Sequence, residues 1–314
     1  MADAMTGTAA VNYDQAAYDR MVYFAFRSQK YFDNIADIKP TRQSMPGSAV
    51  VFTQQNDLAL VTTPASETVD VDAVALSDAQ VTVTLQEYVN AVNTTAKLRG
   101  TSFVEINPIV ANVLGENAGA SLDTIAKNIV VAGTNVTYGG AASSRVTVGA
   151  AMIITADLVR RQYALLQTAR VPKLGGLYTA YIHPEVAYDL RKETGAAAWR
   201  DPHTYSAPNE IWNGEVGVFE GFRFIETPDA PLFVNAGVGG TVDVYGTIFV
   251  GKEAVAKTYS TTDGNGAFPK IIQSPVVDKA RRFQPMAWYW LGGYGVFRQA
   301  SIRRLETSSS IGAN

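Results

Sequence analysis

A segment of 25 residues from Pro108 to Ala132 carries apolar side chains at three- and four-residue steps, and it constrains the fold more than any other part of the chain. That spacing holds one face of a helix until Gly133. The apolar positions are Ile109, Val110, Val113, Leu114, Ala118, Leu122, Ile125, Ala126, Ile129 and Val130. Asn107 as N-cap and Pro108 at the first helical position predict the start. Such a helix spans roughly 37 Å, which is long for a globular protein.

Two glycines four residues apart, Gly115 and Gly119, interrupt this segment. One interpretation is that they allow another backbone to approach closely. The other is a local weak point of about 1 kcal/mol per glycine.

The remainder of the chain favours strands. Period-two patterns at Ala49–Thr53, Val69–Asp72 and Val81–Leu85 predict the strands of a long hairpin or extended loop. Before them, an aromatic segment in residues 1–42 predicts a helical arm that packs on something else. Its apolar stripe consists of Tyr18, Met21, Val22, Phe24, Ala25, Tyr31, Phe32 and Ile35.

A second helix is predicted to begin after Thr155 and to stop at Val171-Pro172. A strand at Tyr178–Ile182 leads through His183-Pro184 into a short helix. Further strands are predicted at 216–219, 222–227 and 242–250. A final aromatic pair of strands, 288–291 and 294–305, is expected to be split by Gly292-Gly293.

Charge is distributed unevenly along the chain. No basic residue lies between Arg42 and Lys97, whereas that stretch holds Asp57, Glu67, Asp70, Asp72, Asp78 and Glu87. The opposite imbalance near the C-terminus comprises Lys279, Arg281, Arg282, Arg298, Arg303 and Arg304. The acids either form a solvated strand face or meet the basic segment, in the same chain or between chains.

Composition argues against most enzyme classes. The chain has no Cys, which excludes thiolate metal sites and Cys nucleophiles, and only two His, His183 and His203. No secretory signal and no membrane-spanning run is predicted. The net charge of −3 disfavours binding of nucleic acid by the whole surface.

The candidate chemical motifs are weak. The run from Gly246 to Glu253 has P-loop spacing, but Glu253 replaces the hydroxyl residue that should meet Mg²⁺, so a strand and a turn are expected. His203 beside Asp201 is interpreted as a turn residue, and Glu215 with Glu220 as the flanks of a strand or turn rather than a glycosidase pair. The aromatic residues from Trp288 to Phe297 are interpreted as sheet residues rather than as a base-stacking surface.

Several segments together nevertheless resemble one family. They are Asn93–Thr101, Asn107–Ala111, Leu122–Ala126, Val131–Asn135, Ile182–Leu190, Trp199–His203 and Ile211–Gly221. In combination they look like the major capsid proteins of tailed bacteriophages, and the resemblance covers about residues 80–228. It implies an α+β chain with the Hong Kong ninety-seven type coat fold.

The resemblance also implies a division of the chain. We expect an N-terminal arm at 1–42, an extended hairpin loop at 43–86, a peripheral domain with a long spine helix at 87–136, an axial domain at 137–280, and C-terminal strands at 281–314 that return to the peripheral domain. Some members of this fold crosslink a loop lysine to a neighbour's asparagine. Residues 43–96 contain no Lys, so this loop lacks that chemistry.

The implied function is that of a structural shell subunit, a virion capsid protein without catalytic role or cofactor. Copies would assemble in the host cytoplasm into hexamers and pentamers of an icosahedral head. Scaffolding, portal or decoration proteins would be further partners, and no membrane would take part. The head would enclose double-stranded DNA, which is bound without sequence preference. The alternatives are an encapsulin-like nanocompartment shell and, more distantly, a hydrolytic enzyme. In the resembling family the loop lies across the adjacent subunit, so we expect inter-subunit contacts between Asp57, Glu67, Asp70 and Asp72 and a neighbour's Arg281, Arg282, Arg298, Arg303 or Arg304.

Overall fold

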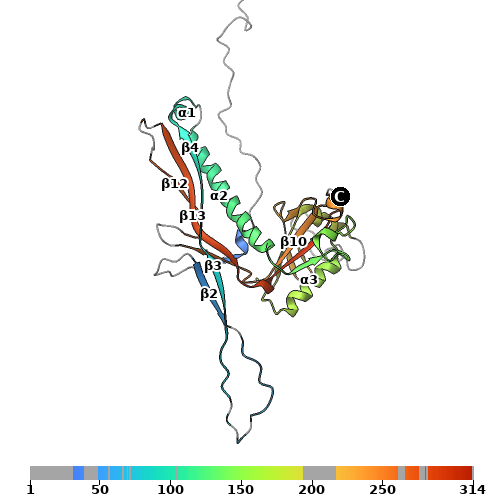
Figure 1. Cartoon of the computed structure of the whole chain (residues 1–314). Coiled ribbons are helices and arrows are strands. Elements are labelled where there is room, and N and C mark those ends of the chain that lie inside the picture. The colour runs from blue at the N-terminus through green and yellow to red at the C-terminus, as the bar shows by residue number, and fades with distance from the viewer. Residues whose placement is uncertain are drawn as a thin grey trace, which may run out of the picture.

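The computed structural model describes residues 31–38, 49–55, 57–65, 67–68, 70, 72–102, 105–193, 217–260, 266–275, 280 and 282–312. These residues form an α+β structure with two main sheets and a separate two-stranded hairpin. In Figure 1 the longest helix, α2 (Ile106–Val131), runs along one sheet and its C-terminal end points toward the other.

The first sheet has five strands and is built around β13 (Phe283–Val296). Its other members are β1 (Ala36–Ile38), β4 (Gln86–Thr95), β11 (Val255–Tyr259) and β12 (Lys270–Gln273). The strands β4, β11 and β12 all pair with β13 in antiparallel orientation, whereas β1 adds to the edge of β11 in parallel. A short helix, α1 (Ala96–Thr101), follows β4.

Helix α2 packs on the aromatic face of this sheet. The buried side of the helix presents Leu114, Ala118, Leu122, Ala126 and Val130, at steps of exactly four residues. Across the interface lie the buried side chains Met286, Trp288, Trp290 and Tyr294 of β13. Burial of each large side chain contributes about 1.5 to 3 kcal/mol, so this interface is the main core of the elongated half of the subunit.

The second sheet has seven strands and is covered by two helices. It comprises β5 (Val136–Tyr138), β6 (Tyr178–Ile182), β7 (Val218–Phe219), β8 (Phe222–Glu226), β9 (Leu232–Phe233), β10 (Val244–Val250) and β14 (Ile302–Thr307). The helices are α3 (Ala156–Thr168), capped by the Thr155 hydroxyl as predicted, and α4 (Pro184–Lys192). All seven residues of β10 are buried, on both faces rather than on one, because Tyr245 and Phe249 pack into one apolar cluster and Ile248 and Val250 into the other.

Short 3-10 turns complete the described chain. They are η2 (Asp33–Ile35), η3 (Arg145–Thr147), η5 (Val238–Gly240) and η7 (Gln299–Ser301).

The predicted hairpin is present as strands β2 (Ala49–Gln55) and β3 (Asp78–Thr84), which pair in antiparallel register. The loop that joins them extends beyond both main sheets in Figure 1. The strand predicted at Val69–Asp72 is wrong for the residues described there, since Asp70 and Asp72 lie outside any strand.

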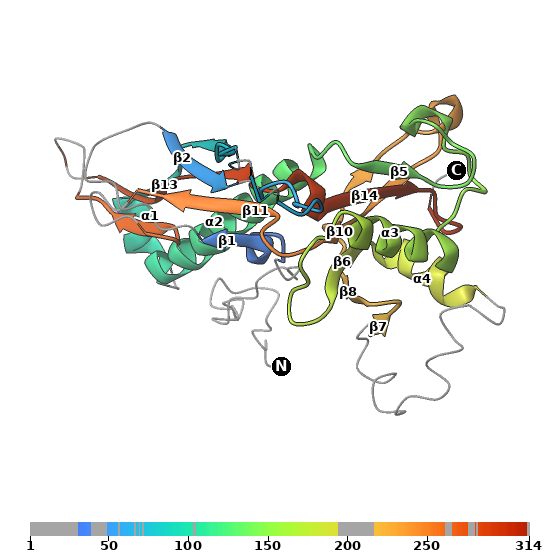
Figure 2. The same cartoon turned by 90° about the horizontal axis from the view of Figure 1, so that it is seen from below.

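The assignment of strands to sheets departs from the predicted boundaries. Strands β11 and β12 fall within the predicted segment 137–280 but belong to the sheet under α2, and β14 joins the seven-stranded sheet rather than returning to the first one. The chain crosses between the sheets through α2, after β10 and again after β13. Figure 2 shows the crossings after β10 and β13. Alternation along a strand reveals which face is buried but not which strand lies beside it.

Three local predictions also need correction. Residues 33–38 form a turn and a strand rather than a helix, and the rest of the predicted arm stripe before Tyr31 lies outside the described residues. Helix α2 begins at Ile106, with Pro108 inside the first turn, where its missing N–H costs nothing. At Gly115 an added Cβ would lie 3.6 Å from a methyl group of Ile271, and at Gly119 nothing lies within 4 Å, so no backbone of the described residues approaches either glycine closely.

The pair Gly292-Gly293 does not split a strand, because β13 continues through it. A Cβ at Gly293 would lie 2.2 Å from the backbone oxygen of Thr84, and one at Gly295 would lie 2.6 Å from a Val83 methyl. These glycines therefore allow the base of the hairpin to cross the sheet closely.

We predict that Gly293→Ala destabilises the subunit by about 1 to 3 kcal/mol, because the added methyl forces β3 away from β13. Urea unfolding measures the change. The control is Gly119→Ala, where nothing lies within 4 Å and the helix gains up to about 1 kcal/mol. Equal stabilities of the two variants would refute the close-crossing explanation.

Candidate assembly surfaces

The loop of the hairpin leaves several apolar side chains exposed to solvent in a single chain. Leu60 is 87% exposed and Val61 is 88% exposed, and Leu58, Val74 and Leu76 are also exposed. The loop acids Asp57, Glu67, Asp70 and Asp72 lie among them and are exposed as well. An apolar surface rimmed by charge is typical of a protein contact.

The base of the hairpin is held firmly. Val83 is buried, and the ring of Phe52 on β2 meets that of Phe297 edge to face, with centroids 6.2 Å apart. The hairpin is therefore anchored on the five-stranded sheet while its loop remains uncovered within one chain.

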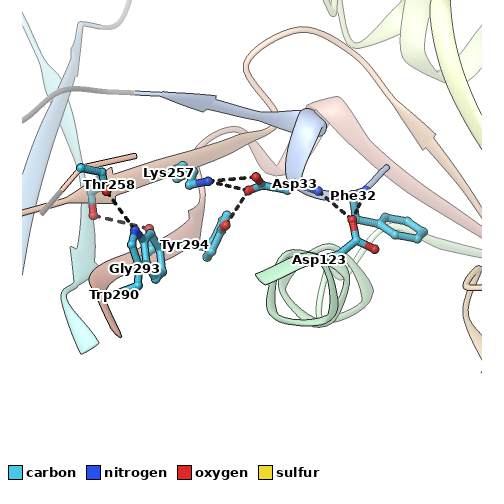
Figure 3. A network of polar contacts seen from close by, with 9 residues as sticks. Phe32, Asp33, Asp123, Lys257, Thr258, Trp290, Gly293 and Tyr294 are labelled. Atoms are coloured by element: carbon cyan, nitrogen blue, oxygen red, sulfur yellow. Dashed lines mark hydrogen bonds and ion pairs between the residues drawn. The ribbon is translucent and has the colours of Figure 1, made fainter. Parts of the chain in front are cut away.

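Residues 31–38, the described part of the predicted arm, enter the core under α2, where their neighbours form the network in Figure 3. Phe32 is 1% exposed and its ring lies 5.1 Å from that of Tyr181. The carboxylate of Asp123, itself buried in α2, accepts hydrogen bonds from the backbone N–H groups of Phe32 at 2.7 Å and Asp33 at 3.2 Å. A helix side chain thus fixes the position of the incoming chain.

Asp33 then pairs with a buried lysine. Lys257 Nζ lies 2.8 and 2.9 Å from the two carboxylate oxygens of Asp33, and the Tyr294 hydroxyl donates to the same carboxylate at 2.5 Å. The ammonium also lies 5.6 Å from the centre of the Trp290 ring and 5.3 Å from that of Phe268. Burial is the larger cause that raises the pKa of Tyr294, and the hydrogen bond to Asp33 is the second. The Tyr294 hydroxyl therefore keeps its proton and remains a hydrogen-bond donor. We call these residues, Asp33, Lys257 and Tyr294, the arm clasp.

The five arginines predicted to meet the acidic loop differ in their surroundings. Arg304 is buried and engaged within its own chain, with Nε 2.7 Å from Glu306. Arg298 Nε lies 3.3 Å from Glu253, and the Arg282 guanidinium lies over the Phe283 ring. Arg281 lies outside the described residues.

Arg303 is the half-buried member of this set. It donates to Gln162 at 3.2 Å, and burial together with nearby Arg161 lowers its pKa. Because a single chain contains no neighbour, the contact between the acidic loop and these arginines stays a prediction.

The candidate catalytic residues have structural surroundings wherever they are described. His183 caps α4 by accepting the Glu185 N–H at 3.4 Å, and Glu220 pairs with Arg160 at 2.9 Å in the turn between β7 and β8. His203 and Glu215 lie outside the described residues. The P-loop-like run is strand β10 followed by a turn, as predicted.

The described part of the chain contains no group of three or more His, Asp or Glu side chains placed to hold a metal ion. None of its helices is both long enough and apolar enough to cross a bilayer.

Comparison with known proteins identifies the family. The sequence model of the phage capsid protein family matches residues 7–310. This chain belongs to that family. It is a capsid protein, a subunit of a phage shell.

Solved capsids share the fold at low sequence identity. The capsid of Ralstonia phage GP4 superposes with a TM-score of 0.76 at 15% identity, covering 95% of this chain and 96% of that chain. The capsid of cyanophage Pam1 gives 0.75 at 13% identity, with 99% and 100% covered. The capsid of a native GTA particle gives 0.64 at 13% identity, with 96% and 98% covered. No curated protein sequence matches this capsid protein.

The arm clasp yields a stability prediction. Asp33→Asn keeps the size of the side chain but removes the charge that faces Lys257, so the free energy of unfolding should fall by about 3 kcal/mol. Urea unfolding measures it. The double variant Asp33→Asn, Lys257→Met should recover most of the loss, whereas an equal loss in the single and double variants would show that charge pairing is not the cause.

The cap of α4 yields a pH prediction. Burial, opposed in part by Glu185 and Glu226, lowers the pKa of His183 from its ordinary 6.5. His183 therefore binds a proton more readily in the unfolded chain than in the folded one. The neutral side chain contributes its full stability above pH 6.5, and this contribution is lost as the pH falls through the lowered pKa of His183 in the folded protein.

We therefore expect His183→Asn, which keeps an N-cap acceptor, to change stability at neutral pH by less than about 1 kcal/mol and to flatten the acid dependence. Urea unfolding at neutral and mildly acidic pH tests both. An unchanged slope between the two pH values would contradict the assignment.

Proposed function

We propose that this capsid protein assembles with copies of itself into hexamers and pentamers of an icosahedral head that encloses double-stranded DNA. Assembly would take place in the host cytoplasm, with scaffolding, portal or decoration proteins as further partners. The role is structural, not enzymatic. Membership of the phage capsid family supports the proposal, and the net charge of −3 agrees with DNA that is enclosed rather than bound by the whole surface of the protein.

One observation carries the assembly proposal. Leu60 and Val61 are almost fully exposed in the hairpin loop. The two strands that this loop joins, β2 and β3, are anchored in the core at their base. Exposed apolar side chains of this kind favour burial against another surface. We propose that the surface belongs to an adjacent subunit.

The proposed division of the chain keeps the arm at 1–42 and the loop at 43–86. The peripheral domain, proposed from the sequence at 87–136, holds α2 and the five-stranded sheet, and so also takes β11 and β12. The axial domain, proposed at 137–280, holds the seven-stranded sheet and gains β14 from the C-terminal segment 281–314. Neither the nanocompartment shell nor the hydrolytic enzyme has an observation in its favour.

Fewer than the five predicted arginines remain candidates for the proposed charge contact with the loop acids. Arg304 is excluded because its guanidinium is buried on Glu306. Arg282, Arg298 and Arg303 remain as described candidates for the loop acids of a neighbour. Exposed pairs contribute about 0 to 1 kcal/mol each, but a shell repeats every contact many times.

We predict that reversing Asp70 and Asp72 to Lys impairs shell formation, and that salt weakens assembly of the unsubstituted protein. Adding Arg303→Glu to the double variant should partly restore shells. The control, Glu87→Lys with Glu105→Lys, makes the same charge change at exposed sites outside the loop. Negative-stain microscopy and light scattering measure the yield. Normal yield from the loop variant, or equal impairment by the control, would contradict the charge contact.

A further inference from the structure

The C-terminal end of α2 lacks a charged side chain of its own. Its last turn contains no basic residue, although the last carbonyls of any helix have no intrahelical donor and carry partial negative charge. One of them, the carbonyl of Val131, accepts a hydrogen bond from Nη1 of Arg304. Arg304 belongs to β14 in the seven-stranded sheet, so a residue of the second sheet caps the helix that packs on the first.

A second charged group holds Arg304 in place. Its Nε donates to Oε1 of Glu306 at 2.7 Å, and Glu306 is fully buried. Arg145 binds the same carboxylate from the other side with both Nε, at 2.9 Å, and Nη2, at 2.7 Å. The Arg145 guanidinium also lies 3.5 Å from the centre of the Phe233 ring. The Glu306 carboxylate would therefore stay paired if Arg304 were removed.

The backbone that leaves α2 is joined to the same strand. The Asn135 side-chain amide donates to the carbonyls of Gln299 at 2.8 Å and Ile302 at 3.3 Å, and the Arg304 N–H donates to the Asn135 carbonyl at 2.9 Å. These contacts attach the chain after the helix, whereas only the guanidinium of Arg304 reaches the helix end itself among them. Apolar side chains of the second sheet, Tyr181, Ile248, Val250 and Ile302, belong to the same buried cluster as α2, and Arg304 adds a polar contact at the end of the helix.

We propose that Arg304, positioned by Glu306 and Arg145, is a positioning residue that sets the angle between α2 and the seven-stranded sheet, and through this angle the curvature of the shell. The second part rests on the proposed shell assembly, whereas the first part concerns a single subunit. An arginine is required because its planar fork donates to Glu306 and to Val131 at once, while a lysine presents one compact ammonium.

The absence of Cys from the sequence allows a direct test. Cysteines introduced as Val113→Cys on α2 and Tyr188→Cys on α4, both at exposed sites, accept spin labels whose separation reports the angle. Labelled subunits are diluted into an excess of unlabelled subunits of the same variant, so that neighbouring labels do not interfere. Arg304→Gln and Arg304→Lys are compared with Arg160→Gln, a control that makes the same charge change on α3, where the arginine pairs with Glu220.

We expect one narrow distance in the unsubstituted protein and in Arg160→Gln, and a shifted or broader distribution in both Arg304 variants. The Arg304 variants should also lose the single shell diameter that electron microscopy shows for the control. Unchanged distances in the Arg304 variants would overturn the angle assignment. Changed distances together with an unchanged shell diameter would overturn the link between this angle and the curvature of the shell. If every variant, including the control, failed to form shells, the result would count against the proposed assembly instead. If Arg304→Gln does not fold, the charge-preserving Arg304→Lys decides the angle alone.

Discussion

The packing of α2 on the aromatic face of β13 is the interaction on which the rest of the subunit depends. Trp288 and Trp290 share one buried cluster with a helix stripe of Leu, Ala and Val that runs from Leu114 to Val130, in a helix of 26 residues about 39 Å long. The result is an elongated, rigid half of the molecule rather than a rounded domain.

Other parts of the structure take their positions from that contact. The arm clasp places Asp33 against Lys257 only because α2 supplies Asp123 to the preceding N–H groups. The hairpin crosses the sheet where β13 has glycines, and its uncovered loop projects from a fixed base. Three crossings of the chain then join this half to the seven-stranded sheet, so the two halves cannot separate as independent domains.

The sequence predicted those features that have a local cause. The period of the apolar residues identified α2, Thr155 identified the start of α3, and alternation identified β6, β8 and the two hairpin strands. The family resemblance then supplied a function that no chemical motif indicated. The features that were missed depend on partners distant in sequence. Lys257 and Asp33 are 224 residues apart, so neither shows its role in its local pattern.

The arginines illustrate the same limit. Arg303 and Arg304 are adjacent in a basic segment, and their sequence gives no reason to treat them differently. In the sheet they face opposite sides, so that Arg304 is buried on Glu306 whereas Arg303 remains half-exposed near Arg161. The Gly292-Gly293 pair is expected from the sequence to split the strand, yet β13 continues through it, and Gly293 together with Gly295 provides space for the hairpin base.

We propose that the uncovered hairpin loop is a contact between subunits of a shell. A cryo-EM reconstruction of particles assembled from the full chain tests this contact. We expect a closed icosahedral shell in which Leu60 and Val61 of one subunit are buried on an adjacent subunit, with the loop acids within a screening length of about 10 Å of that subunit's arginines. A closed shell in which the loop projects into solvent, touching no neighbour, would contradict it.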